Sequence, residues 1–517
     1  MANDALLDFK NELDRLGVPD ILSTPNYVYP GFSNDELFFK AIDDIRLNNL
    51  RILVHGDSDP DGAFGAKIFL ESCNRVGIDN YEFFTYNATS HVLTNEAVYY
   101  AIDKQFDYMI IIDSSTNDML NINRLVSNGI KVIIIDHHQP NYTLDAYPKE
   151  CIVINTVIEN RIRLEDFYRL SGGALTFCLM AEYLNRNGKR YMDLSAYALI
   201  TLYSDSIDMT KELNRAIYYM ATGLSREELP IYVKHFLTEY SIFSRRFIEF
   251  TFVPKINSLF RSENFHLVNS YLFKENSYEE YNNLLDEISR VYDDSRKLVN
   301  LATDLCVREN MDNLVIANLS KISLPIKVNK LYNYTGLVAN TLSNDYGKPC
   351  VVLCDTGVSI KGSFRDCMSR NYLSIFKQFK FFKAEGHNAA FGIGLEYRDY
   401  TRFMRYIKEK IDKKFFILGI VEPLNIEYEN SIPSVDFLTK VALYNEFSGI
   451  SVPIAIIKKK NTLHCTKSFN KSFGYNYSWG MVNVSSTKKL PPGYTLEIKP
   501  IKARNLKLVV YNRTVMI

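Results

Sequence analysis

The stretch Arg51–Gly65, RILVHGDSDPDGAFG, places a short apolar run directly before one histidine and three acids. The apolar run has the length of a strand, and His55, Asp57, Asp59 and Asp61 follow within seven positions. Carboxylates this close raise each other's pKa and oppose folding unless a cation lies among them. The stretch therefore predicts a divalent metal site at the end of a buried strand.

Three more apolar runs follow in the first half of the chain: YMIIIDSS, KVIIIDHH and CIVIN. They alternate with helical patterns, which predicts an α/β fold with a parallel sheet. In such sheets, ligands bind beyond the carboxyl ends of the strands. Polar residues at these ends are therefore expected to meet in one crevice. They are His55, Asp57, Asp59, Asp61, Asp113, Asp136, His137 and His138.

The spacing His55-x3-Asp59-x-Asp61 can present three ligands to one side of a strand end. Asp113 is placed to bridge two ions, and His137 with one further acid would complete a second site. That acid is Asp205 or Asp208, and we favour Asp205. A single aspartate at a strand end is more often a helix or turn cap, so the prediction depends on the combination.

Oxygen-rich ligands with a few imidazoles and no thiolate favour Mn²⁺ or Mg²⁺. Two such ions can activate a water molecule and stabilise the attacking and leaving oxygens of a phosphoryl displacement. The constellation therefore predicts a two-metal phosphoesterase.

The rest of the chain indicates further domains, since 517 residues suffice for about three. Residues Ser277–Arg308 contain no Gly or Pro and have helical spacing, a shorter α/β pattern follows, and short β-rich runs begin near Gly419. We predict a parallel-sheet domain at 1–275, a connecting helix at 276–310, a smaller α/β domain at 311–417 and a small β-barrel or β-sandwich at 418–517.

The net charge of zero hides a basic end. Between Ser451 and Ile517 there are twelve Lys or Arg and one acid, Glu497. Aromatic residues, including the single tryptophan, Trp479, lie among these cations. Positive side chains that follow a phosphate backbone, together with aromatic faces for bases, are typical of single-strand nucleic-acid sites.

Four motifs, HGDSDPDG, IIIDSS, IIIDHH and LYSDSIDM, resemble in order the signatures of the DHH phosphoesterase superfamily. Three further segments, VPKINSLFR, IKGSFR and EGHNAAFG, are similar to segments of the RecJ-like single-strand exonucleases. The resemblance covers roughly residues 50 to 400. It implies a DHH domain, a DHH-associated domain, and an oligonucleotide-binding (OB-like) barrel at the end of the chain.

The resemblance also implies roles for individual residues. One ion would be held by His55, Asp59 and Asp113, and the other by Asp61, Asp113, His137 and Asp205. His138 would face the scissile phosphate, with Asp57 and Asp136 supporting the ligands. Substrate contacts would come from Asn257, Arg261, Ser363, Arg365, Gly386 and His387.

The chain departs from the family pattern in three places that bear on these roles. The usual Asp-Asn-Gly reads Asp113-Ser114-Ser115, and the usual Gly-Gly-His reads Glu385-Gly386-His387. The usual Asn-Ala-Ala-Gly-Arg reads Asn257-Ser258-Leu259-Phe260-Arg261. None of these changes removes a predicted ligand, so an active enzyme is expected.

The resemblance implies a metal-dependent single-stranded-DNA exonuclease of 5′ to 3′ polarity that releases 5′-mononucleotides, with a role in DNA repair and recombination. Two alternatives are a phosphodiesterase for oligoribonucleotides or cyclic dinucleotides, and an inactive RecJ-like DNA-binding subunit. The partners would be single-stranded DNA and a single-strand-binding protein or helicase. The charged N-terminal segment lacks a signal-peptide core and no long apolar run occurs, so we expect a cytoplasmic protein without a membrane partner.

Overall fold

The structure is a computed structural model that describes residues 2–84, 92–158, 169–238, 241–320, 322, 331–367, 370–412, 424–427, 434–448, 453–460, 464–470, 474–479, 482–486, 495–501 and 507–510. The chain divides into two compact units. Unit 1 contains the chain up to Ser289 and a segment that begins at Asp436, and unit 2 contains most of the residues from Arg290 onward.

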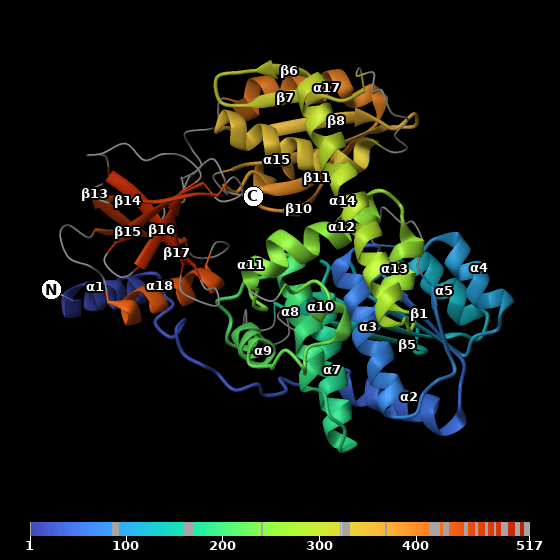
Figure 1. Ribbon diagram of the computed structural model, residues 1–517. Helices are drawn as coiled ribbons and strands as arrows, with labels where there is room; N and C mark the ends of the chain where they lie inside the picture. Colours follow the sequence, from blue (N-terminus) through green and yellow to red (C-terminus); the bar gives the residue numbers. More distant parts are fainter. Residues whose placement is uncertain are drawn as a thin grey trace. The chain divides into compact units, whose positions relative to one another are not determined.

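Unit 1 is built around a sheet of five parallel strands in the order β2-β1-β3-β4-β5 (Figure 1). Its strands are β1 (Ile52–Gly56), β2 (Tyr81–Phe84), β3 (Tyr108–Ile112), β4 (Lys131–Asp136) and β5 (Cys151–Asn155). Strand β2 lies on one side of β1 and all later strands lie on the other side. The carboxyl ends of β1 and β3 therefore form a topological switch point, where a ligand crevice is expected.

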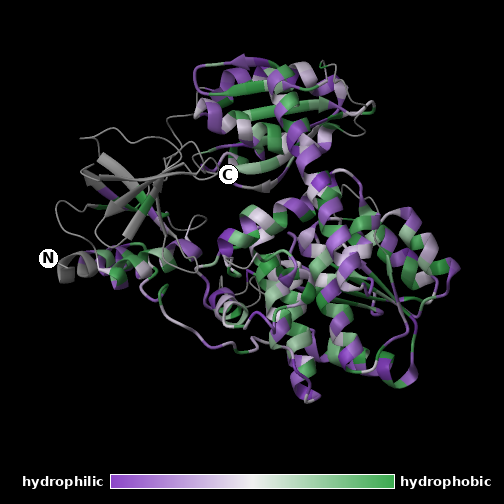
Figure 2. Ribbon diagram, in the orientation of Figure 1, coloured by the Kyte–Doolittle hydropathy of each residue, from purple (hydrophilic) through white to green (hydrophobic). Residues whose placement is uncertain are grey.

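The strands of this sheet are apolar because helices cover both faces. Residues Ile110, Ile111 and Ile112 of β3 have no exposed surface. Helices α4 (Asn95–Asp103) and α5 (Met119–Ser127) pack on one face, and α3 (Pro60–Arg75) and α7 (Gly172–Arg186) cover the other (Figure 1). Figure 2 shows the hydrophobic residues gathered in the sheet and in the helix faces beside it. This burial confirms the parallel α/β prediction for the first half of the chain.

Further helices complete unit 1. They are α1 (Ala2–Arg15), α2 (Asp35–Asn48), α8 (Ser195–Ser204), α9 (Glu212–Thr222), α10 (Ile231–Lys234), α11 (Arg245–Phe247), the π-helix Ile248–Phe252, α12 (Val253–Arg261), α13 (Phe265–Leu272) and α18 (Val435–Phe447). Helix α18 is far along the sequence, yet its Phe437 and Tyr444 rings contact Phe9 of α1 at 6.1 and 5.6 Å. Its Glu446 Oε2 accepts a hydrogen bond from the Tyr218 hydroxyl of α9 at 3.1 Å.

Helix α14 (Tyr278–Leu305) runs without a break through 28 residues, and the boundary between the units falls within it. The absence of Gly and Pro predicts this continuity. In unit 2 a six-stranded sheet has the order β10-β11-β9-β8-β7-β6. Its strands are β6 (Val307–Asn310), β7 (Val315–Asn318), β8 (Cys350–Asp355), β9 (Ile360–Arg365), β10 (Lys383–His387) and β11 (Ala390–Leu395), with helices α15 (Thr335–Tyr346), α16 (Leu373–Phe376) and α17 (Tyr400–Tyr406).

A third sheet contains seven strands in the order β12-β13-β17-β18-β16-β15-β14. They are β12 (Leu424–Glu427), β13 (Ala455–Lys460), β14 (His464–Asn470), β15 (Gly474–Trp479), β16 (Val482–Ser486), β17 (Thr495–Ile501) and β18 (Lys507–Val510). The β-rich end is thus confirmed. Because no pairing joins β12 to β14 within the described ranges, the OB-like barrel stays a prediction, as do the three boundaries between the predicted domains.

Within the described part of the chain, no helix is both long enough and apolar enough to cross a bilayer.

Candidate metal centre

The polar residues at the strand ends of unit 1 meet around the imidazole of His137. Its Nε2 lies 3.1 Å from Asp113 Oδ1, 3.6 Å from Asp205 Oδ2 and 3.8 Å from Asp61 Oδ2. Asp113 follows β3, Asp61 lies in the first turn of α3, and Asp205 follows α8. Side chains from three separate segments thus surround one ring nitrogen.

Three groups of side chains bring ligand atoms within 4.8 Å of one another. One contains Asp113, His137 and His138, a second contains Asp61, His137 and Asp205, and a third contains Asp57, Asp59 and Asp113. Asp113 and His137 each belong to two groups, and the Asp113 carboxylate, with two oxygens, is the one of the pair that could be shared by two ions. The third group contains Asp57, which the sequence places only in a supporting role.

Asp59 also serves as the N-cap of α3, where its Oδ1 accepts a hydrogen bond from Gly62 N at 3.0 Å. Asp59 therefore has the helix-capping role that is usual for an aspartate at a strand end, and it also belongs to the third group.

Asp61 is held by the first turn of α7. Its Oδ2 accepts a hydrogen bond from Gly172 N at 2.8 Å, and its Oδ1 accepts one from Gly173 N at 2.9 Å. A helix N-terminus stabilises negative charge through its unpaired amides and its dipole. A Cβ atom on Gly172 would lie 2.6 Å from Asp113 Cβ, so only glycine lets α7 approach both acids.

The acids fit a cation because the protein alone leaves their charge poorly compensated. Burial, then the neighbouring Asp205 and Asp59 carboxylates, hold the pKa of Asp61 well above its usual range. Burial and the Asp61 carboxylate likewise raise the pKa of Asp113. Asp113 Oδ1 is buried and accepts no hydrogen bond among the described residues. A divalent cation would supply the missing partner and favour the ionised forms.

His55 is fully buried, and its Nδ1 lies 3.1 Å from the Phe84 carbonyl oxygen. Burial lowers the pKa of His55 to about 4, so the ring is neutral at ordinary pH. A hydrogen bond from Nδ1 to a carbonyl leaves Nε2 as the unprotonated, metal-ligating atom. His55 does not join the three groups described above.

His138 is paired with Asp136 through Nδ1 and Oδ1, which are 2.7 Å apart. Burial acts to lower the pKa of His138, but the Asp136 carboxylate outweighs it and raises the pKa to about 9. Burial also acts to raise the pKa of Asp136, yet His138 and His137 hold it well below its usual range. The pair is therefore an imidazolium beside a carboxylate at neutral pH in the metal-free protein.

The choice between Asp205 and Asp208 follows from the loop after α8. Asp208 Oδ1 accepts hydrogen bonds from Thr210 N and Oγ1 at 2.9 and 2.7 Å, which makes Asp208 a turn-stabilising residue. Asn214 of α9 donates from Nδ2 to the Asp208 carbonyl at 2.8 Å and fixes the same loop. Of these two acids, only Asp205 belongs to a group of ligand atoms among the described residues, so Asp205 remains the proposed ligand.

The loop after Asp113 has a strained backbone. Asp113 and Ser115 have φ values of +65° and +70°. Ser115 stands where the family pattern usually has glycine, the residue that adopts this conformation without a steric cost. Serine in place of the family's usual glycine therefore changes the side chain, while the backbone at this position still has a left-handed conformation.

Ser115→Gly is expected to leave the free energy of unfolding within about 1 kcal/mol of the parent value, since the relief of strain offsets the greater freedom of the unfolded chain. Ser115→Val is expected to lower it by at least about 1–2 kcal/mol, because a β-branched side chain resists a left-handed backbone. Denaturant titration of both variants checks this. Equal stability of the two would contradict the left-handed conformation.

The predicted substrate residues lie in both units. Asn257 and Arg261 are on α12 in unit 1. In unit 2, Ser363 and Arg365 are on β9, and Gly386, with φ +137°, and His387 are on β10. The strand register places Arg365 opposite Ala390, and Ala390 opposite His387, in one line across three strands. The side chain of His387 lies outside the described residues, as do those of the C-terminal aromatic residues such as Trp479.

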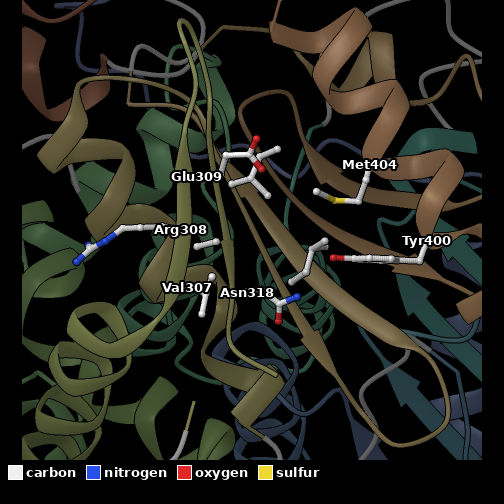
Figure 3. A pocket seen from close by; sticks show the side chains of 9 residues that line it. Val307, Arg308, Glu309, Asn318, Tyr400 and Met404 are labelled. Atoms are coloured by element: carbon white, nitrogen blue, oxygen red, sulfur yellow. The ribbon is translucent and has the colours of Figure 1, made fainter. Parts of the chain in front are cut away.

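A separate pocket of about 160 Å³ lies in unit 2 between the β6–β8 strands and α17. Figure 3 shows Tyr400 and Met404 reaching from α17 toward the strand residues. The volume is below that of ordinary small-molecule sites, and its lining includes none of the metal-ligand groups found in the described residues.

Sequence reasoning missed the residues that hold the ligands. Gly172 and Gly173 support Asp61, Thr116 contacts Asp136, and Asn155 contacts Thr116. The available signals were the Gly pair that opens α7 and the asparagine that ends the CIVIN strand.

Residues 51–202 match the DHH family, N-terminal domain. This region contains β1 to β5, α7 and most of the clustered acids and histidines. Residues 51–202 thus form a DHH-family phosphoesterase domain, and Asp113, His137 and His138 form its candidate metal-binding cluster.

Comparison with individual proteins shows that the chain is distantly homologous to two proteins, RecJ and YorK. The chain is 22% identical over 449 residues to the "Putative SPbeta prophage-derived single-strand DNA-specific exonuclease YorK" of Bacillus subtilis (strain 168), which covers 79% of this chain and 74% of that protein. It is 21% identical over 451 residues to the single-stranded-DNA-specific exonuclease RecJ of the same organism, covering 81% of this chain and 54% of RecJ.

Among solved structures, the RecJ of Thermus thermophilus in complex with Mn²⁺ matches with a TM-score of 0.71 and 16% identity, over 97% of this chain and 74% of that one. The same protein in complex with Mg²⁺ matches with a TM-score of 0.68 and 14% identity, over 97% and 73%. At this identity the likeness establishes a RecJ-like fold.

Proposed function

We propose that the protein is a metal-dependent exonuclease that hydrolyses single-stranded DNA in the 5′ to 3′ direction and releases 5′-mononucleotides. The observation that carries the proposal is the position of His137 Nε2 among Asp61, Asp113 and Asp205. Buried like charges from separate segments are costly without cations. The relatives' names, single-strand DNA exonucleases, support this substrate class.

Two Mn²⁺ or Mg²⁺ ions fit the donor set of this centre. In the proposal one ion would be held by His55, Asp59 and Asp113, and the other by Asp61, Asp113, His137 and Asp205. Asp57 is an additional candidate because it lies within 4.8 Å of Asp59 and Asp113. Bound together, two such ions lower the pKa of a water molecule and stabilise the attacking and leaving oxygens of a phosphodiester.

His138 contributes a different function in this proposal. The Asp136 carboxylate fixes Nδ1, and the remaining ring nitrogen donates a hydrogen bond to the scissile phosphate. The Asp136 carboxylate favours the protonated form of this ring in the metal-free protein, which would make the bond charge-assisted.

The proposed strand contacts are Asn257 and Arg261 in unit 1 and Ser363, Arg365, Gly386 and His387 in unit 2. A guanidinium suits phosphate oxygens because its fork of N–H donors matches them. The Arg365 guanidinium lies so close to α15 that a Cβ on Gly336 would be 2.8 Å from Nη2. The seven-stranded sheet, with the basic C-terminal stretch, is the proposed single-strand-binding module of OB-like type.

The test uses the full chain with single strands labelled at the 5′ or the 3′ end, in Mn²⁺, beside Asp113→Ala. We expect mononucleotides from the 5′ label at the earliest times, shortened fragments from the 3′ label, and no products from the variant. Cleavage of dinucleotides or cyclic dinucleotides but not of long strands would overturn the exonuclease proposal in favour of a small-substrate phosphodiesterase. Strand binding without cleavage would favour an inactive DNA-binding subunit.

A further inference from the structure

The loops that follow β3 and β4 are joined through one buried carboxylate, Asp136. Its Oδ1 accepts hydrogen bonds from the backbone amides of His137 and His138 at 2.7 and 3.1 Å, and it also lies 2.7 Å from His138 Nδ1. Its Oδ2 accepts hydrogen bonds from Thr116 N and Oγ1 at 3.2 and 2.5 Å. Each oxygen of Asp136 is thus bonded, and the orientation of the carboxylate is fixed.

Thr116 is in turn held by residues of two further segments. Asn155 at the end of β5 donates from Nδ2 to Thr116 Oγ1 at 3.2 Å, and the Tyr147 hydroxyl donates to the Thr116 carbonyl at 2.7 Å. Because the Thr116 oxygen accepts from Asn155, its own hydrogen is directed to Asp136. Thr116 and Asn155 are each only 1% exposed, so solvent cannot replace these bonds.

Asn155 also fixes the backbone that carries His138. Its Nδ2 donates to the His138 carbonyl at 3.0 Å, and its Oδ1 accepts from the amides of Val157 and Ile158 at 2.9 and 3.3 Å. One side chain therefore anchors both the main chain of His138 and, through Thr116 and Asp136, its imidazole. Buried hydrogen bonds in such a chain strengthen one another.

We infer that Thr116 and Asn155 are positioning residues that orient the imidazole of His138 through Asp136. This inference rests on the proposed function for the part of His138 in hydrolysis. The side chain of Thr116 lies in the loop where the sequence departs from the family's Asp-Asn-Gly pattern. Thr116 directly follows the two altered residues, Ser114 and Ser115, and its hydroxyl is bonded to the carboxylate behind His138.

The decisive comparison is Thr116→Val against Thr116→Ser. Valine removes the hydroxyl at nearly constant volume, and serine keeps it. We expect Thr116→Val to lower kcat about 10- to 100-fold, with KM for the strand and the affinity for Mn²⁺ each within about threefold of the parent. Thr116→Ser should retain kcat within about threefold. Thr116→Ala deletes the same hydroxyl without placing a methyl group against Asp136, and gives the same test if Thr116→Val does not fold.

Two further measurements separate the positioning role from a general effect. In a His138→Asn background, Thr116→Val should cause little additional loss of kcat, because both changes act on one group. In the metal-free protein, the Nδ1 resonance of His138, assigned with His138→Asn, should shift in Thr116→Val and stay in place in Thr116→Ser.

Unchanged kcat and an unchanged His138 resonance in Thr116→Val would overturn the inference, as would equal losses of kcat in the valine and serine variants. A parent protein that cleaves no strand, while Thr116→Val still shifts the His138 resonance, would overturn the proposed function and leave the positioning role intact.

Discussion

Asp113→Asn is expected to lower the rate of Mn²⁺-dependent strand cleavage by at least about a thousandfold, equivalent to roughly 4 kcal/mol of transition-state stabilisation. Asp113 belongs to two of the three ligand groups, and its Oδ1 lies 3.1 Å from His137 Nε2. An amide of the same shape keeps the volume but removes the charge that two cations would share. The measurement is single-turnover cleavage of a labelled strand at saturating Mn²⁺.

Asp118→Asn is the matched control for that experiment. Asp118 is also a buried acid after β3, but its Oδ1 caps α5 by accepting from Asn121 N, its Oδ2 accepts from Leu93 N, and it lies outside the ligand groups among the described residues. Asparagine keeps one acceptor oxygen and loses the other, so Asp118→Asn costs stability but leaves the ligand groups intact. We expect cleavage within about threefold of the parent. Comparable losses of cleavage rate in the two variants would show that cleavage depends on any buried acid of this loop. That result would contradict a specific role for Asp113.

Mn²⁺ is expected to stabilise the parent protein and not Asp113→Asn. At a free concentration one hundred times the dissociation constant, binding to the folded state alone adds about 2.7 kcal/mol to the free energy of unfolding. Without metal, the same variant should be at least about 1 kcal/mol more stable than the parent, because a buried, repelled charge has been removed. Denaturant unfolding with and without chelator measures both effects.

In the metal-free protein, the change of the free energy of unfolding with pH should show that the buried carboxylates destabilise the fold when they ionise. The pKa values of Asp61 and Asp113 are raised in the folded state, so the folded protein retains protons that the unfolded chain has released. These groups therefore reduce stability as pH rises from the unfolded value of 3.8 toward the folded pKa values. Asp113→Asn should flatten this decline relative to Asp118→Asn. A metal-free parent whose stability rises over this range more steeply than that of Asp113→Asn would contradict the assignment.

The candidate site was predictable from sequence to the extent that its residues occupy strand ends. The apolar runs before Asp113 and His137 identify parallel strands, and topology brings their carboxyl ends together. Asp61, Asp113 and His137 accordingly meet in the structure, whereas Asp205 follows helix α8 and strand-end position does not account for its place beside them. Strand-end position is a local property, and a single sequence is enough to recognise it.

The supporting residues were not predictable because their roles depend on long-range packing. Gly172 donates to an acid 111 residues earlier, and Asn155 reaches Thr116 across 39 residues. The left-handed conformation of Ser115 could not be predicted from its residue type either, since serine rarely adopts this conformation. Helix α18 joins unit 1 although the sequence pattern assigns its residues to a C-terminal β-rich domain.

The central claim is that two divalent cations lie among the clustered acids and histidines of unit 1. Anomalous diffraction at the manganese absorption edge, from crystals soaked in millimolar Mn²⁺, tests it most directly. The account predicts two peaks roughly 3.5 to 4 Å apart, one on each side of Asp113. No peak within the cluster, or peaks confined to other surfaces of the protein, would contradict it.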